Sequence, residues 1–221
     1  MDVVHVVHDA SNITTMGISL NSSCKLCRRE GVSLCGKEKC AFKRRPFPPG
    51  VHGPQYAKRK PRLSSYGLQL REKQKAKRLY NIMERQFVKY VSDALRKKGN
   101  TATYLVQLLE TRLDNVVYRL GFASTRRQAR QMVSHGFFMV NDAFVNIPSY
   151  QVRPGDAIKI KATKSAKGLV KNLSERLSKQ QTPAWLSLDA SAMSGKVTSI
   201  PEGEDLRQVF DPTLIVEFYS R

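Results

Sequence analysis

The pattern of hydrophobic and polar positions predicts three helices in the first half of the chain. From about residue 69 to residue 98, apolar residues recur at the spacing of one helical face, and Gly99 followed by Asn100 marks the end of that helix. Residues 104–110 and 113–120 carry two shorter apolar faces of the same period. We expect these faces to form a hydrophobic core.

A helix–turn–helix followed by a small sheet is predicted over residues 111–160. Ser124 or Thr125 is expected to cap a helix that ends at Gly136. The runs FFMVND and AFVNI then alternate about a polar turn, and RPGDAIKIKA predicts a turn followed by a strand. The chain as a whole is therefore expected to be α+β.

Three arginines stand near the start of the helix predicted after Thr125. Its apolar face is Ala129, Met132 and Val133, so the arginines are expected on the remaining surface; they are Arg126, Arg127 and Arg130. Guanidinium groups beside the exposed N–H groups of a helix N-terminus bind phosphate well. This arrangement predicts a compact RNA-binding module, with an ordinary α+β fragment as the alternative.

Residues 41–63, AFKRRPFPPGVHGPQYAKRKPRL, break the helical pattern. Five prolines and two glycines argue against regular helix or a central strand, so we expect an extended connector. Its seven Lys and Arg residues are interleaved with Phe42, Phe47 and Tyr56, which suits RNA, because cations meet phosphates and rings stack on unpaired bases. A solvated linker is the alternative, but it would need neither the prolines nor the aromatic residues.

The charge of the chain also indicates a nucleic-acid partner. The 221 residues include 38 Lys and Arg against 18 Asp and Glu, a formal net charge of +20. The excess lies in residues 24–80, at +14, and residues 81–182, at +11, whereas residues 183–221 carry −3. At 41% hydrophobic residues the chain is not disordered as a whole, and no run approaches the roughly 18–20 apolar residues of a membrane span. We expect no membrane partner.

Residues 1–23 differ from the rest, because they contain no Lys or Arg. They lack the positive start and long apolar run of a secretory signal and the arginines of a transit peptide. Two interpretations stay open: a disordered leader, and a misassigned start codon with Met16 as the true start. A reducing, cytoplasmic compartment is expected.

All four cysteines fall within seventeen residues, in the pattern C-x2-C-x7-C-x4-C formed by Cys24, Cys27, Cys35 and Cys40. Two such pairs supply the four ligands of a tetrahedral zinc site, and the neighbouring Lys and Arg residues favour thiolates. The segment is too short and polar to fold on an apolar core, so the metal would supply most of its folding energy. We expect a structural zinc knuckle; free thiols, another metal or a redox pair are the alternatives.

Several motifs carry a family resemblance. The run TRLDNVVYRLGFASTRRQARQMVSHGFFMVNDAFVN resembles the RNA-binding domain named after small-subunit ribosomal protein four, which also occurs in pseudouridine synthases, tyrosyl-tRNA synthetases and heat-shock RNA binders. CKLCRREG, KRRPFPPGVHG, TPAWLSLD and LIVEFYSR, in this order, resemble the bacterial-type ribosomal protein four family itself. The resemblance covers residues 24–221. The loop from Cys27 to Cys35 is shorter than is usual in the family, and residues 1–23 do not match it.

The resemblance implies an α+β fold in four parts. They are a leader or misassigned start at 1–23, a zinc knuckle, basic connector and helical body at 24–110, an inserted helix–turn–helix with a small antiparallel sheet at 111–164, and a C-terminal segment at 165–221 that packs back on the helices at 64–110. In this last segment Leu169, Leu173 and Leu177 recur at helical spacing, and LIVEFY is predicted to be a terminal strand.

The resemblance further implies a structural constituent of the small ribosomal subunit that binds its ribosomal RNA, nucleates assembly and contributes to translational accuracy. Small-subunit ribosomal protein five is an implied neighbour, messenger RNA is an implied contact where it enters the subunit or as the protein's own operon transcript, and no small-molecule substrate is implied. A cytoplasmic or an organellar ribosome would fit. Mapped onto this chain, the RNA contacts are Arg44, Arg45, His52, Lys58, Arg59, Lys60, Lys73, Lys77, Arg78, Arg126, Arg127, Gln128 and Arg130.

Two other functions could use the same module. An RNA-modifying enzyme would need catalytic groups, and the sequence has no P-loop, G-x-G-x-x-G, H-E-x-x-H or G-x-S-x-G motif. Glu202, Glu204 and Asp205 cluster, but this is typical of a helix N-terminus. A dedicated translational repressor would share the RNA chemistry, but would not sediment stoichiometrically with the small subunit. We expect no catalytic residue.

Overall fold

The computed structural model describes residues 22–58, 62–165, 173, 177 and 180–220. The helices are α1 (Ser23–Glu30), α2 (Ala41–Arg44), α3 (Gly53–Lys58), α4 (Ser65–Leu79), α5 (Glu84–Leu95), α6 (Thr101–Glu110), α7 (Leu113–Arg119), α8 (Arg126–Ser134), α9 (Ala162–Ser165), the 3-10 helix η2 (Gly203–Leu206) and α12 (Pro212–Tyr219). The strands are β1 (Phe138–Val140), β2 (Ala143–Phe144), β3 (Ala157–Ile160), β4 (Leu186–Asp189) and β5 (Ser194–Val197). Within these described ranges, no helix is both long and apolar enough to cross a bilayer.

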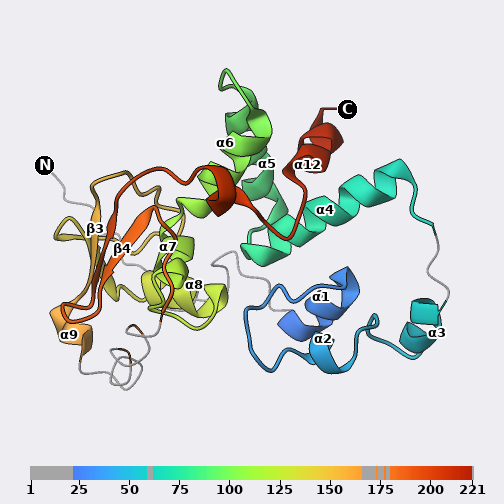
Figure 1. The fold of residues 1–221 in the computed structure, drawn as a ribbon, viewed down its shortest axis with the longest axis horizontal. Coiled ribbons are helices and arrows are strands. Elements are labelled where there is room, and N and C mark those ends of the chain that lie inside the picture. The colour runs from blue at the N-terminus through green and yellow to red at the C-terminus, as the bar shows by residue number, and fades with distance from the viewer. Residues whose placement is uncertain (1–21, 59–61, 166–172, 174–176, 178–179, 221) are drawn as a thin grey trace, which may run out of the picture.

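Two separate hydrophobic cores divide the molecule into two halves that lie side by side (Figure 1). The helical half contains α1 to α6 and α12, and its core includes Phe87, Leu105 and Ile215. The sheet half contains α7, α8 and the five strands, and its core includes Val133 and Ile158. The fold is α+β, as the sequence predicts.

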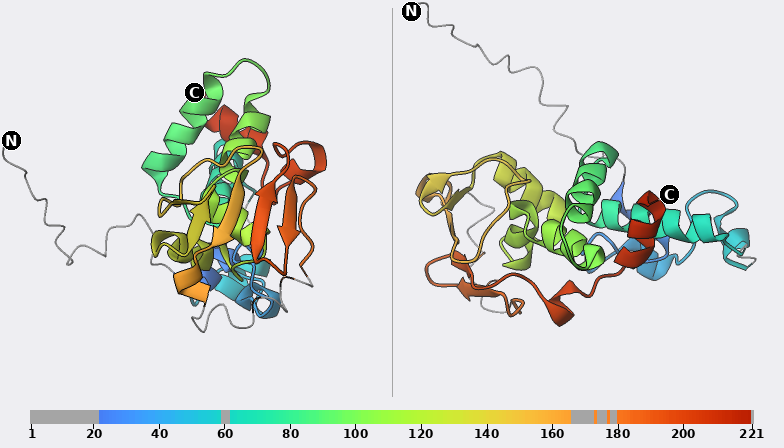
Figure 2. Two further views of the ribbon diagram at one scale, coloured as in Figure 1. Left: turned by 90° about the vertical axis from the view of Figure 1, so that its left-hand side faces the viewer. Right: turned by 90° about the horizontal axis from the view of Figure 1, so that it is seen from above.

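The five strands form one antiparallel sheet in the order β2-β1-β3-β5-β4 (Figure 2). The hairpin between β1 and β2 turns at Asn141 and Asp142, whose φ angles of 49° and 65° fit a tight two-residue turn. This confirms the predicted pair of strands about a polar turn. Leu120, the residue that follows α7, packs closely on the sheet at Gly195 of β5, where a Cβ atom would come within 2.6 Å of the Leu120 side chain.

Two of the helix starts follow from their capping side chains. The Asn100 side chain accepts hydrogen bonds from the backbone N–H groups of Ala102 and Thr103, at 3.0 and 3.3 Å, and α6 begins at the next residue. Thr125 likewise accepts from the backbone of Gln128 at 3.2 Å and starts α8. The cap predicted at Ser124 or Thr125 is therefore confirmed at Thr125.

The single helix predicted over residues 69–98 is wrong, because the structure has two helices there. α4 ends at Leu79 and α5 begins at Glu84. Asn81 lies between them with a φ of 53°, in the left-handed region, which ends the first helix. Tyr80 and Ile82 remain buried through this turn, at 2% and 3% exposure, so the apolar period continues although the helix does not.

The terminal strand predicted for LIVEFY is also wrong, because these residues form helix α12. The Asp211 side chain accepts a hydrogen bond from the backbone of Thr213 at 2.8 Å, and Pro212 occupies the first helical turn. Phe218 and Tyr219 then pack their rings against Tyr66 and Phe87, with centroids 5.5 and 6.2 Å apart. The connector likewise contains two short helices, α2 and α3, where none was expected.

The C-terminal segment is divided between the two halves. The family resemblance predicts that residues 165–221 pack on the helices at 64–110, and α12 does lie against α4 and α6. The strands β4 and β5 instead extend the sheet, and Leu173 and Leu177 are buried in the core of the sheet half. Leu169 lies outside the described residues.

Candidate nucleic-acid interface and metal centre

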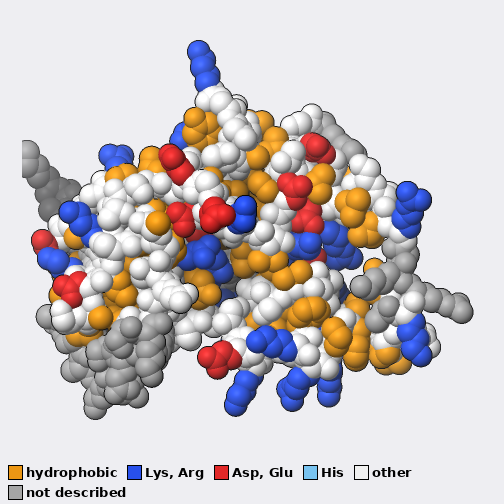
Figure 3. Space-filling view, viewed as in Figure 1, with side chains coloured by type: hydrophobic (Ala, Val, Ile, Leu, Met, Phe, Trp, Pro, Cys, Tyr) orange, Lys and Arg blue, Asp and Glu red, His pale blue; other side chains and the backbone are white. Residues whose placement is uncertain are grey.

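The surface around α1 and α2 is strongly cationic. Figure 3 shows a row of Lys and Arg side chains projecting from the lower edge of the molecule, where α1 and α2 lie. The exposed members of this cationic edge are Lys25, Arg29, Lys37, Lys39, Lys43, Arg44 and Arg45. Neither Arg44 nor Arg45 forms an ion pair with any described carboxylate. These two predicted RNA contacts are therefore available to a polyanion.

The connector continues this surface toward α3. His52 and Lys58 are exposed, whereas Arg59 and Lys60 lie outside the described residues. Arg28 of α1 holds the connector in place, because its guanidinium donates to the backbone oxygens of Phe47 and Pro48 at 2.9 and 3.1 Å. The same guanidinium lies 4.9 Å from the centre of the Phe47 ring, so that ring already has a cationic partner inside the protein.

The three cations predicted as RNA contacts on α4 are engaged inside the protein. Lys73 and Lys77 each place their Nζ 2.8 Å from a different oxygen of Glu84. The Lys73 Nζ also lies 4.5 Å from the centre of the Phe218 ring. Arg78 pairs with the buried carboxylate of Glu30. These side chains tie α4 to α1, α5 and α12.

The Glu84 carboxylate predicts that the stability of the protein depends on pH in the acid range. Burial raises its pKa, but hydrogen bonds from Lys73, Lys77 and Tyr219 outweigh burial and lower the pKa from 4.5 to about 2. A depressed carboxyl pKa contributes stability that is present above about pH 4.5 and is lost as the pH falls toward 2. Because the Glu84 side chain is 41% exposed, we expect this contribution to be about 1 kcal/mol. The free energies of unfolding of wild type and Glu84→Gln, measured in urea, should differ at pH 7 and should differ much less at pH 2. An equal difference at both pH values would contradict this prediction.

The arginines of α8 do not all lie on the surface. Arg127 and Gln128 are half-buried, and the Gln128 side-chain oxygen accepts from the backbone of Ser124 at 2.9 Å. Arg126 is also half-buried, and its Nε donates to Asn115 at 2.8 Å. Arg130 is only 5% exposed and pairs with Asp114, so the expectation that it lies on the surface is wrong.

Asp114 forms ion pairs with two buried arginines at the junction of the helical half and the sheet half. Arg112, with no exposed surface, donates to both Asp114 oxygens at 3.0 and 2.6 Å, and Arg130 donates to Oδ2 at 3.2 Å. Arg112 also donates to the Tyr90 hydroxyl of α5 at 2.5 Å. Ion pairing with Asp114 outweighs the effect of burial on Arg112 and raises the pKa of its guanidinium.

Glu110 is the centre of a second buried network of hydrogen bonds, close to that of Asp114. Its Oε1 accepts hydrogen bonds from Tyr80, Arg119 and Gln208 at 2.6, 2.9 and 3.0 Å. Its Oε2 accepts from Asn115 and Arg119 at 2.8 and 3.0 Å. Burial raises the pKa of this carboxyl, but the charge and hydrogen bonds of Arg119 outweigh burial and lower it. The pKa of the Tyr80 hydroxyl is raised by burial and by the Glu110 charge, so Tyr80 stays the donor.

Neither of these two networks is predicted by the sequence pattern. Both acidic residues lie in the apolar run LVQLLETRLDNVVYRL, and Glu110 and Asp114 are 1% and 4% exposed. A carboxylate at a position where the helical period predicts burial is the available signal, because buried charges need partners. The sequence could have indicated paired carboxylates here, but not which arginines pair with them.

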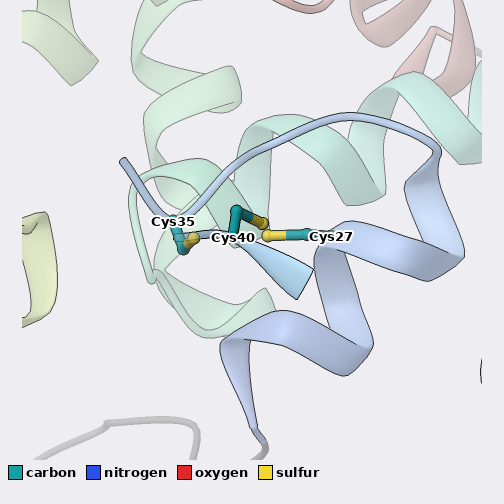
Figure 4. A group of neighbouring side chains, drawn as sticks. All are labelled: Cys27, Cys35 and Cys40. Atoms are coloured by element: carbon teal, nitrogen blue, oxygen red, sulfur yellow. The ribbon is translucent and has the colours of Figure 1, made fainter. Parts of the chain in front are cut away.

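Three of the four cysteines come together in the helical half. Cys27, Leu34 and Cys40 are buried in its core, so the expectation that this segment has no apolar core of its own to fold on is wrong, because it packs on the core of the helices. The Sγ atoms of Cys27, Cys35 and Cys40 all lie within 4.8 Å of one another (Figure 4). Cys27 belongs to the second turn of α1, Cys35 to the loop that follows, and Cys40 is the residue before α2. Tetrahedral zinc with Zn–S bonds of about 2.3 Å separates its sulfur atoms by about 3.8 Å. The three thiols therefore fit a zinc ion. Cys24 is half-buried in the first turn of α1 and is not part of this group.

The surroundings of the three thiols also suit a metal. The backbone N–H of Leu34 donates to the Sγ of Cys27 at 3.3 Å. Burial raises the pKa of Cys27 to about 12, so a cation is needed to make it a thiolate at neutral pH. At Cys40 burial also favours the neutral thiol, but hydrogen bonds from Ser33 and Phe42 outweigh it and lower the pKa. The donor set is typical of a structural site for a thiophilic metal.

Known proteins match this chain over nearly its whole length. A family model described as "Ribosomal protein S4/S9 N-terminal domain" matches residues 20–110, and one described as "S4 domain" matches residues 111–158. A protein of Thermodesulfovibrio yellowstonii named small ribosomal subunit protein uS4 is 50% identical over 206 residues, which cover 90% of this chain and 97% of the relative. The uS4 proteins of Thermus thermophilus and Dictyoglomus turgidum are 48% and 51% identical, over 93% and 90% of this chain and 100% and 96% of their own lengths.

Proposed function

The chain belongs to the family of small ribosomal subunit protein uS4, and from this membership we propose how its surfaces serve the subunit. It is a structural, non-enzymatic constituent of the cytoplasmic small ribosomal subunit and binds ribosomal RNA. The family match carries this conclusion, and the net charge of +20 agrees with it. Within the subunit, we propose that it binds early, nucleates assembly and contributes to translational accuracy.

We propose that the cationic edge is the main RNA-binding surface. Arg44 and Arg45 are exposed members of it, and His52 and Lys58 are exposed on the connector that continues it. None of the four forms an ion pair with a carboxylate in the described part of the chain, so all can reach phosphates. Arg127 and Gln128 at the start of α8 are proposed as a second contact, on the other half. Lys73, Lys77, Arg78, Arg126 and Arg130 are instead assigned to ion pairs and hydrogen bonds that hold separate helices together inside the protein.

Sedimentation of a cell extract through a sucrose gradient tests the function as a whole. We expect this chain to travel with the small subunit in a stoichiometric amount and to remain there in moderate salt. A chain that stays at the top of the gradient, or that appears in a small fraction of subunits only, would speak for a dedicated repressor or a transient RNA-modifying factor.

The double substitution Arg44→Ala/Arg45→Ala tests the placement of the RNA surface. Each phosphate contact contributes about 0.7–0.9 to the slope of log K against log salt, so we expect the slope to fall by about 1.4–1.8. Filter binding of transcribed small-subunit rRNA over a salt series measures it. The control Arg85→Ala/Lys89→Ala removes the same charge from the exposed side of α5. Equal losses in both variants would mean that overall charge, not the cationic edge, drives binding.

We also propose that the cysteine group holds a structural zinc ion. Cys27, Cys35 and Cys40 are three ligands by their mutual distances. Cys24 is the proposed fourth, because it precedes Cys27 by one turn of α1 and residues at this spacing share a helix face. A closed site of four thiolates leaves no open position for chemistry, so the metal would stabilise the α1–α2 region that carries the cationic edge.

We propose two further partners on the family resemblance. Small-subunit ribosomal protein five is expected as a protein neighbour, and messenger RNA is expected as a contact where it enters the subunit or as the operon transcript. Cross-linking within purified small subunits, followed by mass spectrometry, tests the first. Loss of repression when this chain is depleted tests the transcript.

A further inference from the structure

The seam between the two halves is filled by buried polar groups rather than by shared apolar packing. The hydrophobic cores of the helical and sheet halves are two separate clusters. Between them lie the networks centred on Glu110 and Asp114, with exposed fractions of 1% and 4%. The chain crosses this seam at Glu110, the last residue of α6, and again between Val197, in the core of the sheet half, and Leu206, which packs against the core of the helical half.

We propose that Glu110 and its partners are positioning residues that fix the orientation of the sheet half on the helical half, and thereby the geometry with which the two RNA contacts meet one RNA. This inference rests on the proposed RNA-binding function. It assigns no RNA contact to Glu110 itself, which is buried. It assigns the network the task of setting the distance between the cationic edge and the start of α8.

The contacts of Glu110 show why it can set this orientation. Tyr80, at the end of α4, and Gln208, in the returning chain, donate to Oε1 from the helical side. Asn115 and Arg119, both on α7, donate from the sheet side. One carboxylate is therefore shared between the halves, and each of its bonds constrains direction as well as distance.

Arg126 extends the network to the RNA-facing helix. Its Nε donates to the Asn115 side chain at 2.8 Å, and Asn115 in turn donates to Glu110. Its guanidinium lies 4.5 Å from the centre of the Tyr118 ring and 5.3 Å from that of Tyr80, which belongs to the other half. The first residue of α8 is thus held against both halves, directly beside Arg127 and Gln128.

The energetics of buried charge favour a positioning role over a simply stabilising one. Removing charges from water costs about as much as their attraction returns, so a seam of apolar residues could be equally stable. Apolar contacts are non-directional, however, and two apolar faces can slide or rotate with little change in buried area. A fully hydrogen-bonded carboxylate gives one arrangement in place of several.

The orientation matters because the RNA contacts lie on both halves. The cationic edge belongs to the helical half and the start of α8 to the sheet half. A groove of about 1140 Å³ lies between them, and its lining includes Lys37 in the loop between α1 and α2, Tyr118 of α7 and Thr125 at the start of α8. An RNA that binds both surfaces at once gains affinity only if the distance between the two surfaces matches the distance between the two RNA segments that bind them. This gain is lost when the orientation of the two halves varies.

Glu110→Gln in the full-length protein tests the proposal, since glutamine keeps the size but removes the charge. We expect its affinity for transcribed small-subunit rRNA to fall by about tenfold or more, because the cationic edge and the start of α8 can then no longer bind one RNA at the same time. The slope of log K against log salt should also become shallower, because fewer phosphates are contacted. Spin labels placed by unnatural amino acids at the exposed positions Lys43 and Lys159 should show a broadened distance distribution. The control is Val133→Ala, which shortens a core side chain of the sheet half that makes none of the hydrogen bonds of the Glu110 network.

The possible outcomes distinguish a failure of the RNA-binding function from a failure of the positioning role alone. If wild type does not bind the rRNA, the proposed function fails and the positioning role falls with it. If wild type binds and Glu110→Gln has the same affinity and the same distance distribution, the positioning role alone is overturned. If Val133→Ala loses affinity as strongly as Glu110→Gln, general destabilisation explains the effect and positioning is again overturned. Should Glu110→Gln fail to fold by circular dichroism, Tyr80→Phe, which removes one donor from the helical side, takes its place with the same expectations.

Discussion

Replacing Asp114 by alanine is expected to lower the free energy of unfolding by about 3–5 kcal/mol, because it leaves two buried guanidinium groups without their carboxylate. Arg112 has no exposed surface and Arg130 is 5% exposed, so neither can turn to water without moving α7 or α8. Domains of this kind are stable by only about 5–15 kcal/mol, so the loss is a large fraction of the total. Urea unfolding at pH 7, followed by circular dichroism, measures it.

Two controls show whether burial is the cause. Glu204→Ala also removes a carboxylate from an arginine, but Glu204 and Arg207 are 86% and 81% exposed, so we expect a change below about 0.5 kcal/mol. The triple variant Arg112→Leu/Asp114→Leu/Arg130→Met replaces the whole group with apolar side chains and should recover most of the loss. A small effect of Asp114→Ala, equal to that of Glu204→Ala, would contradict the prediction.

The sequence predicts best where structure is set by local chemistry. Thr125 caps α8 through its own side chain, as predicted, and Asn141 and Asp142 accept the positive φ angles that a tight hairpin needs. Asn100, which the pattern predicts only to end one helix, also caps the next. The antiparallel strands around that hairpin follow from simple alternation. These elements depend on a few neighbouring residues, and the pattern of those residues is visible in the chain.

Prediction fails where distant residues decide the structure. The apolar period does not reveal the break at Asn81, because Tyr80 and Ile82 stay buried when the chain turns. LIVEFY is short enough to be strand or helix, and its helical form packs Phe218 and Tyr219 onto α4 and α5. A short apolar run does not carry this information by itself.

The candidate site divides in the same way. The exposure of cations such as Arg44 and Arg45 can be predicted from the basic composition of residues 41–63 and from the prolines and glycines that interrupt the helical pattern there. Arg130 does not, because its partner Asp114 is sixteen residues away in the sequence and the two meet only when α7 packs on α8. A helical wheel treats an arginine as a surface residue, and only the three-dimensional partner shows that it is buried.

Removing the metal should have the largest effect of all, since structural zinc contributes about 10–16 kcal/mol of binding free energy in zinc-finger peptides. We expect purified protein to carry close to one zinc per chain, and chelation to unfold the region of α1 and α2 and abolish its RNA binding. The sheet half should persist, because its core contains none of the four cysteines. Atomic emission measures the metal, and hydrogen exchange after chelation locates the unfolded residues. Because the ligands must lose their protons, affinity should rise with pH.

Two cysteine variants separate the members of the site. Cys40→Ser removes a thiol that belongs to the group of three and should lose the metal completely. Cys24→Ser removes the half-buried thiol outside that group, and a loss of equal size would identify it as the fourth ligand. Retention of full zinc affinity would instead mean that water or another group completes the site. Protein purified under reducing conditions without chelator, folded and free of metal, would contradict the zinc proposal, because the three thiols would then be held together by the packing of Cys27, Leu34 and Cys40 in the helical core.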